Sequence, residues 1–293
     1  MSNLVIGGDG MIGRAVADVL HARGESVFTT TRRSSLVSER CHFLDLERPV
    51  DDFEPDASVR VAFFCAGHNP SQCTQDPNLS YRVNVTYPRA LMQRMERRGI
   101  FVVKLSSNAI FDGQHAYSTT TALHGPKSIY GRHHSEFDQI ITMDNNDVAI
   151  VRFTKVIASG IPTFCGWLAD LHADQAIRPL SDLYMSPISL PFIVNLIVRS
   201  GLKRQRGIFQ ASAAQDISYA EAALILVDKL NYSRSLVQPA TMREIGIEQS
   251  NVPRHTTLDM KETIAAFGIQ PPSINEAIDY LAEMAPMSSG VAG

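Results

Sequence analysis

Cysteine is scarce in this sequence, and its placement argues against both disulfide bonds and a zinc site. The 293 residues include four cysteines, and none of them forms a Cys-x-x-Cys pair. Cys65 lies inside an apolar run, as a buried thiol does. A disulfide framework and a zinc centre are therefore not expected, and the spacing favours reduced thiols.

The sequence also lacks an excess of charge of either sign and any long apolar run. Lysine and arginine total 27 against 30 acidic residues, so the formal net charge is -3. A nucleic-acid partner and an acidic disordered tract are thus not indicated. No run reaches the length of a membrane span, and the first residues do not resemble a leader. We expect a cytoplasmic protein without membrane contacts, and we expect residues 286–293 to form a frayed tail.

Short apolar segments alternate with longer amphipathic ones through the first half of the chain. Segments rich in β-branched and aromatic residues predict strands, and helical periodicity predicts helices. The predicted strands cover residues 3–6, 26–31, 59–65, 101–105 and 148–153. The predicted helices cover residues 11–23 and 79–98, with a third after Tyr130, and Pro88 marks a start or a kink within the second. This alternation predicts an α/β fold with a Rossmann-type doubly wound parallel sheet.

The second half of the chain is less regular and mostly helical in pattern. The predicted helices cover residues 164–172, 190–199, 219–230, 258–267 and 273–284, and a short strand covers 207–210. We assign residues 1–155 to an NAD(P)-binding domain, to which segments near 177–212 return. Residues 156–285 then form a smaller region that mainly binds the substrate.

The stretch LVIGGDGMIGRAV runs from the first predicted strand into the first predicted helix, and three of its four glycines, Gly7, Gly10 and Gly13, are spaced three residues apart. The first glycine allows a tight turn, the second lets the backbone approach a pyrophosphate, and the third lets helix and strand pack closely. The positive end of the helix dipole then faces the phosphates. We predict a dinucleotide site, although a glycine-rich turn without a ligand is the alternative. The residues concerned are Gly7, Gly10, Met11, Ile12 and Gly13.

The residues after the second predicted strand indicate which dinucleotide binds. The stretch FTTTRRSS has two arginines where NAD-binding proteins usually have an acid. Guanidinium groups suit a 2′-phosphate, so NADP(H) is favoured over NAD(H), unless the arginines are only solvated loop charges. Asp45 is either a contact to the adenine or a loop carboxylate. The predicted cofactor contacts beyond the glycine loop are Arg32, Arg33, Asp45, Cys65, Ala66, Gly67, Tyr130 and His134.

The candidate catalytic residues are Ser107, at the end of a predicted strand, and Tyr130, ahead of a predicted helix. Ser107 is suited to hydrogen-bond a carbonyl, and Tyr130 to donate a proton to it. A free tyrosine titrates near pH ~10, so it needs a nearby cation to act near neutrality. His134 lies one helical turn later and would be mostly neutral at pH 7, which leaves Lys127 or Lys155 as possible cations. Each of these side chains also has a purely structural alternative.

Several motifs together resemble the extended short-chain dehydrogenase/reductases, and within them the dTDP-4-dehydrorhamnose reductase family of sugar-nucleotide-binding proteins. GGDGMIGRAV resembles the family's glycine loop, and KLSSNAIFDG its Ser-Thr-Asp-Tyr-Val-Phe-Asp-Gly stretch. YGRHHSE resembles its Tyr-Gly-x-x-Lys-x-x-Glu, with His134 in place of the lysine. PLSDLYMSPISL and PRHTTLDMKETIAAFGI resemble its later segments. The similarity extends over nearly the whole chain.

The resemblance implies hydride transfer from NAD(P)H to a keto carbon of a nucleotide-linked deoxysugar. Ser107 would polarise the carbonyl, Tyr130 would protonate the oxygen, and His134 would take the lysine position. A homodimer is implied at the family level. A second hypothesis is a catalytically weak or inactive NAD(P)-binding regulatory subunit, because the regulatory beta subunit of methionine adenosyltransferase resembles the same family. No metal ion is expected in either case, because adjacent histidines such as His133 and His134 do not share a helical face.

Overall fold

The computed structural model describes residues 1–143, 147–248 and 252–285, so the predicted tail at 286–293 lies outside the described residues. Its centre is a sheet of seven parallel strands. The strands are β1 (Ser2–Ile6), β2 (Ser26–Thr31), β3 (Cys41–Phe43), β4 (Val59–Phe64), β5 (Phe101–Ser107), β6 (Val148–Phe153) and β10 (Gly207–Ala211). Their spatial order is β10-β6-β5-β4-β1-β2-β3, which confirms the predicted doubly wound fold.

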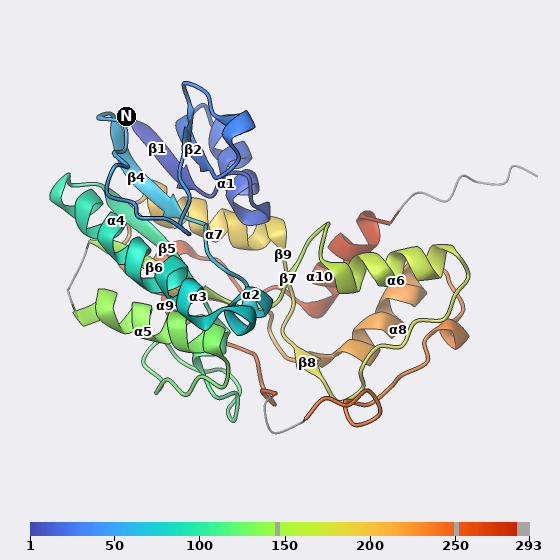
Figure 1. The fold of residues 1–293 in the computed structure, drawn as a ribbon. Coiled ribbons are helices and arrows are strands. Elements are labelled where there is room, and N and C mark those ends of the chain that lie inside the picture. Colours follow the sequence, from blue (N-terminus) through green and yellow to red (C-terminus); the bar gives the residue numbers. More distant parts are fainter. Residues whose placement is uncertain (144–146, 249–251, 286–293) are drawn as a thin grey trace, which may run out of the picture.

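Helices cover both faces of the sheet (Figure 1). The helices are α1 (Met11–Ala22), α2 (Pro70–Gln75), α3 (Pro77–Tyr81), α4 (Tyr87–Arg97), α5 (Ile129–Met143), α6 (Pro162–His172), α7 (Leu190–Leu202), α8 (Tyr219–Lys229), α9 (Lys261–Phe267) and α10 (Ile274–Glu283). Successive strand residues point to opposite faces, so β4 places Val61 and Phe63 against α1 and α7. Its Ala62 and Phe64 pack against α4 and α5 on the other face.

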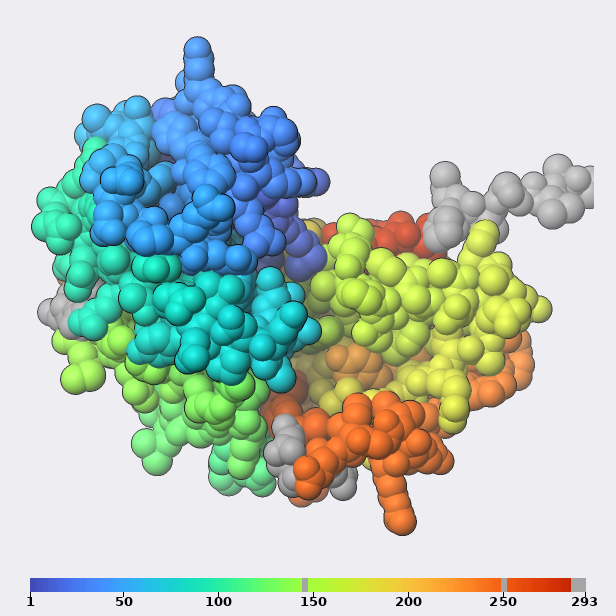
Figure 2. Space-filling view, viewed as in Figure 1, coloured from blue at the N-terminus to red at the C-terminus, as the bar shows by residue number. Residues whose placement is uncertain are grey.

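The second region lies beside the carboxyl ends of the strands and contains α6, α8 and α10 (Figure 1). It also contains four two-residue strands, which are β7 (Val156–Ile157), β8 (Tyr184–Met185), β9 (Ile188–Ser189) and β11 (Ile217–Ser218). The chain returns to the sheet through α7 and β10, which pairs with β6. Figure 2 shows the molecular surface hollowed between this region and the sheet region.

The long helix predicted over residues 79–98 is not continuous. The structure has α3, then a π-helical turn (Arg82–Thr86), then α4. Pro88 has no N–H to donate to the carbonyl of residue 84, which favours a break in the regular ladder near this point. At this turn the Asn84 side chain accepts from the His68 N–H at 2.7 Å and donates to its carbonyl at 3.2 Å. The turn thus holds the loop after β4.

The helix predicted from residue 258 begins only at Lys261. Residues 258–259 are extended instead, because their backbone N–H groups bond across the chain. Leu258 donates to the Ser212 hydroxyl at 3.1 Å, and Asp259 donates to the carbonyl of Ser118 at 3.1 Å.

The three-residue edge strand β3 was not predicted from the sequence, because CHF alone is too short to carry a strand pattern.

Candidate functional site

The glycine loop has the geometry that its sequence predicts. Gly7 has φ of 79°, a left-handed conformation that glycine adopts without strain. A Cβ atom on Gly13 would lie 2.1 Å from the Gly7 carbonyl oxygen, so only glycine allows α1 to approach the strand this closely. Gly10 is the N-cap residue of α1, and its N–H donates to the carbonyl of Gly7. The free N–H groups of the first helical turn are therefore presented at the carboxyl edge of the sheet.

A cavity of about 500 Å³ lies beyond this loop. Arg32, Arg33 and Asp45, which are predicted to contact the cofactor, all line this cavity. The structure adds two carboxylates that the sequence reasoning missed. Glu47 pairs with Arg32 at 3.0 Å, and Asp9 pairs with Arg33 at 2.9 Å. Both guanidinium groups are about half exposed, so a competing phosphate can displace these weak surface pairs.

A second cavity of about 540 Å³ adjoins the first. The two share the segment after β4, namely Cys65, Ala66, Gly67 and His68, so they form one continuous groove. The second cavity is lined by the remaining predicted site residues except Gly13, namely Met11, Ile12, Ser107, Tyr130 and His134. Gly13 acts instead through the helix–strand approach described above. Tertiary folding therefore joins the glycine loop to the Ser107–Tyr130 pair, more than 90 residues later in the chain.

Ser107 and Tyr130 meet at the end of β5. A hydrogen bond from Ser107 lowers the pKa of Tyr130, but burial raises it more, to about 12. The phenol therefore keeps its proton throughout the physiological range. Ser107 Oγ also accepts from the backbone N–H of Ala109 at 3.1 Å, which fixes the start of the following 3₁₀ turn (Asn108–Ile110). This arrangement presents a hydroxyl and a protonated phenol to one cavity.

His134 packs edge-on against Tyr130, with ring centroids 4.4 Å apart. Burial, and then the positive charge of Lys104, lower the pKa of His134 well below its usual value. The imidazole is therefore neutral at pH 7, and its Nδ1 has no hydrogen-bond partner among the described residues. This neutral ring does not supply the charge that a lysine at this position would supply.

Lys104 is a site residue that the sequence reasoning missed. It lies on β5 with 5% of its surface exposed, and it lines the second cavity with Tyr130 and His134. The available signal was the charged residue inside the apolar strand FVVKL, because lysine is almost never fully buried without a partner. Of the two lysines considered from sequence, Lys155 also lines the cavity, whereas Lys127 is exposed.

A buried ion pair anchors α5, which carries Tyr130 and His134. Asp138 is 0% exposed, and its Oδ2 accepts from Arg152 Nε and from the Ser106 hydroxyl, both at 2.9 Å. Arg152 also donates to His124 Nε2 at 3.2 Å. The His124 Nδ1–H is therefore free to donate to Ser135 Oγ on α5, 2.8 Å away. These bonds hold the helix against β5 and β6.

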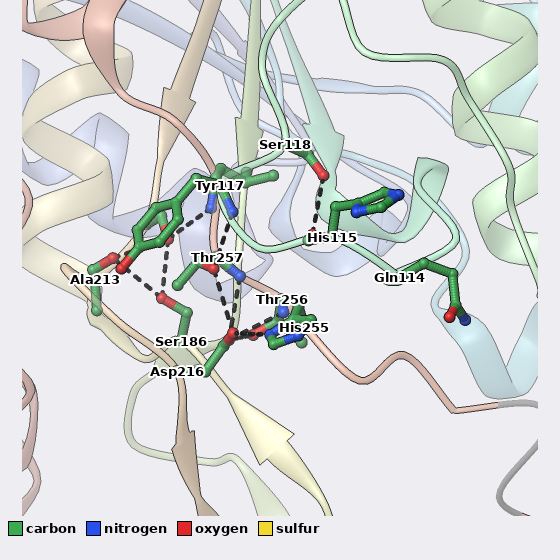
Figure 3. Close-up of polar contacts among 12 residues, drawn as sticks. Gln114, His115, Tyr117, Ser118, Ser186, Ala213, Asp216, His255, Thr256 and Thr257 are labelled. Carbon is green, nitrogen blue, oxygen red and sulfur yellow. Dashed lines mark hydrogen bonds and ion pairs between the residues drawn. The ribbon is translucent and has the colours of Figure 1, made fainter.

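The far wall of the second cavity comes from the C-terminal part of the chain. It is lined by Lys155, Ile161, Tyr184, Met185, Tyr219 and Thr256. Figure 3 shows how Asp216 holds the segment that contains Thr256. The carboxylate accepts from the N–H and hydroxyl of Thr256, at 2.9 and 2.7 Å, and from the N–H of Thr257 at 3.1 Å. This contact fixes Thr256 at the edge of the cavity.

Comparison with known proteins places this chain in a family. A family model described as the RmlD substrate binding domain matches residues 1–285. The dTDP-4-dehydrorhamnose reductase of Streptomyces griseus is 24% identical, over 92% of this chain and 88% of its own. Methionine adenosyltransferase 2 subunit beta of Rattus norvegicus is 22% identical, over 81% of this chain and 75% of its own.

A solved structure has the same fold. The dTDP-4-dehydrorhamnose reductase of Bacillus anthracis str. Ames in complex with NADP superposes with a TM-score of 0.81 at 18% identity, over 96% of this chain and 99% of its own. The family that the sequence motifs predicted is confirmed. The chain belongs to the RmlD substrate binding domain family.

Proposed function

We propose that this protein is an NADPH-dependent reductase of a keto group on a nucleotide-linked deoxysugar or a similar small carbonyl compound. The observation that carries the proposal is the single groove that runs from the glycine loop to Ser107 and Tyr130. Residues 1–155, with β10 returning to their sheet, are assigned to the cofactor, and residues 156–285 mainly to the substrate. Homodimer formation remains a prediction.

The residues of the groove fit a dinucleotide. The glycine loop and the start of α1 suit its pyrophosphate, and Arg32 and Arg33 suit a 2′-phosphate. When bound, the cofactor supplies a hydride to the carbonyl carbon. Ser107 donates a hydrogen bond to the carbonyl oxygen, and Tyr130 transfers its phenolic proton to that oxygen as negative charge develops there.

The environment of Tyr130 favours reduction over oxidation. A phenol with a pKa near 12 is fully protonated at pH 7, as a proton donor must be. An alkoxide is more basic still, so the transfer remains downhill. The reverse reaction needs the phenolate as a base, and burial makes that form scarce. A proton from solvent restores the phenol after turnover.

Calorimetry with NADPH and with NADH tests the cofactor half of the proposal first. Binding of NADPH then leads to an assay of NADPH consumption with 4-keto-6-deoxysugar nucleotides. Consumption with at least one of these compounds is the expected result. The absence of binding by either dinucleotide would overturn the oxidoreductase assignment.

Arg32 and Arg33 are expected to set the cofactor preference. Charge-assisted hydrogen bonds contribute about 1.5–3 kcal/mol, so Arg32→Ser with Arg33→Ser should weaken NADPH binding roughly 10-fold or more. NADH has no 2′-phosphate, and its affinity should change by less than about threefold. Calorimetry of both ligands measures the ratio. Arg234→Ser, which removes an exposed arginine paired with Asp228, is the matched control.

The acids beside these arginines provide an opposite test. Glu47 and Asp9 occupy the guanidinium groups that a phosphate needs. Glu47→Gln should therefore tighten NADPH binding relative to NADH. An unchanged ratio in both this variant and the double arginine variant would contradict the assigned 2′-phosphate site.

The alternative function is an NAD(P)-binding subunit that regulates a partner enzyme. Two observations favour it, namely a neutral His134 beside Tyr130 and the similarity to methionine adenosyltransferase 2 subunit beta. Tight NADPH binding without consumption of any keto-sugar nucleotide is the result that this alternative predicts.

A further inference from the structure

Lys104 is a buried ammonium group with hydrogen-bonding capacity to spare. Its Nζ carries three N–H donors, and within the described chain one acceptor is found, the backbone carbonyl of Leu105. The Phe137 ring lies beneath the ammonium, with its centroid 5.0 Å from Nζ. Two donors therefore remain, in a side chain that is 5% exposed and lines the second cavity. A buried donor without an acceptor is costly, so a ligand with acceptor oxygens fits this position.

The charges around Lys104 leave this part of the site positive. Asp138 on α5 is the carboxylate that acts on Lys104. Its two hydrogen bonds, however, are both accepted by Oδ2, from Arg152 and from Ser106. One carboxylate thus faces two cations. The other titratable groups that face Lys104 are uncharged at pH 7, since burial raises the pKa of the Cys65 thiol to about 12 and keeps His134 neutral.

We propose that Lys104 is the cation of this site, and that its free N–H donors bind the nicotinamide ribose of the cofactor beside a neutral His134. Lys104 on β5 thereby supplies the positive charge that the neutral His134 on α5 does not supply. Ribose hydroxyls suit Lys104 better than phosphates do, because the glycine loop and the start of α1 already serve the phosphates. This inference rests on the proposed function.

Two other lysines are less suited to this role. Lys127 is exposed and lies outside both cavities. Lys155 lines the second cavity too, but its ammonium lies against α6 of the C-terminal region, 5.6 Å from the centroid of the Phe164 ring. Lys104 is instead next to the end of β4, since it pairs in register with Phe64, the residue before Cys65. That position is where the two cavities join.

The test is the pH dependence of NADPH affinity. Burial lowers the pKa of Lys104 to about 8, so the ammonium is charged below that pH and neutral above it. Between pH 7 and pH 9.5 the Kd for NADPH of the unmodified protein should rise about 10-fold. Lys104→Met should bind NADPH about 10-fold more weakly at pH 7 and show a flat profile over this window. Lys127→Met should reproduce the unmodified profile.

The outcomes separate the two proposals. Absence of NADPH binding by the unmodified protein at pH 7 overturns the proposed function, and this inference with it. Normal binding together with an unchanged profile in Lys104→Met overturns the inference alone. If the pH dependence of NADPH affinity is lost in Lys155→Met and kept in Lys104→Met, the cation is Lys155, and the inference about Lys104 is again overturned.

A second measurement uses only the unmodified protein. The chain has six lysines, so their Nζ or ε-methylene signals can be followed separately by NMR as pH is raised. Lys104 should titrate near pH 8 in the free protein, below Lys155, whose pKa burial lowers by less. NADPH should raise the pKa of that lysine, because acceptor oxygens favour the charged form. A titration that NADPH leaves unchanged would show that the ammonium does not contact the cofactor.

Discussion

Tyr130→Phe is expected to reduce turnover of a reducible keto-sugar nucleotide about 10²- to 10⁴-fold, the usual contribution of a positioned general acid. The substitution removes only the phenolic oxygen, so the ring should keep its contact with His134. NADPH affinity should therefore change little, by less than about threefold. Steady-state NADPH consumption and calorimetry measure the two quantities. A loss in kcat without a loss of cofactor binding is what a proton donor predicts.

The matched control is Tyr280→Phe on α10, which removes a hydroxyl outside both cavities. Its turnover should equal that of the unmodified protein. If Tyr130→Phe retained more than about a tenth of the activity, another group would have to be the proton donor. The keto substrate would then receive its proton from water or from a different side chain of the groove.

Asp138→Asn is expected to cause the largest loss of stability. It removes the carboxylate from a pair in which Asp138 is 0% and Arg152 is 2% exposed, and it leaves the charges of Arg152 and Lys104 without an opposite charge. Breaking a buried pair in this way costs about 3–5 kcal/mol. For a chain of this size the melting temperature should fall by roughly 10 °C. Scanning calorimetry or circular dichroism measures the change.

Asp228→Asn is the control, because it breaks an exposed pair with Arg234. Surface pairs of this kind contribute little, so its melting temperature should stay unchanged. Equal melting temperatures for Asp138→Asn and the unmodified protein would show that the α5 anchor depends on packing alone. Retained stability with a lower kcat would instead assign Asp138 a role in the site itself.

Much of the fold and of the groove was predictable because the signals are local. Apolar strands such as 148–153 are buried on both faces, and their composition shows this directly. The glycine loop is recognised from its spacing alone, because the backbone needs a glycine at each position and all three positions lie within seven residues of sequence. Predictions were wrong where a partner distant in sequence decides the conformation. Residues 258–259 are extended because Ser118 and Ser212 accept their N–H groups.

The sequence by itself determined the α/β class, the glycine loop, and the presence of a serine, a tyrosine and a histidine at motif spacing. Only the tertiary structure decided the charges at the site. Arg32 and Arg33 line the first cavity together with Glu47 and Asp9, which is visible only once β2 and the loops are folded side by side. The charge of Lys104 acts on His134, because Lys104 on β5 packs against Phe137 of α5. Electrostatic energy depends on distance and burial, and neither quantity is encoded in local sequence pattern.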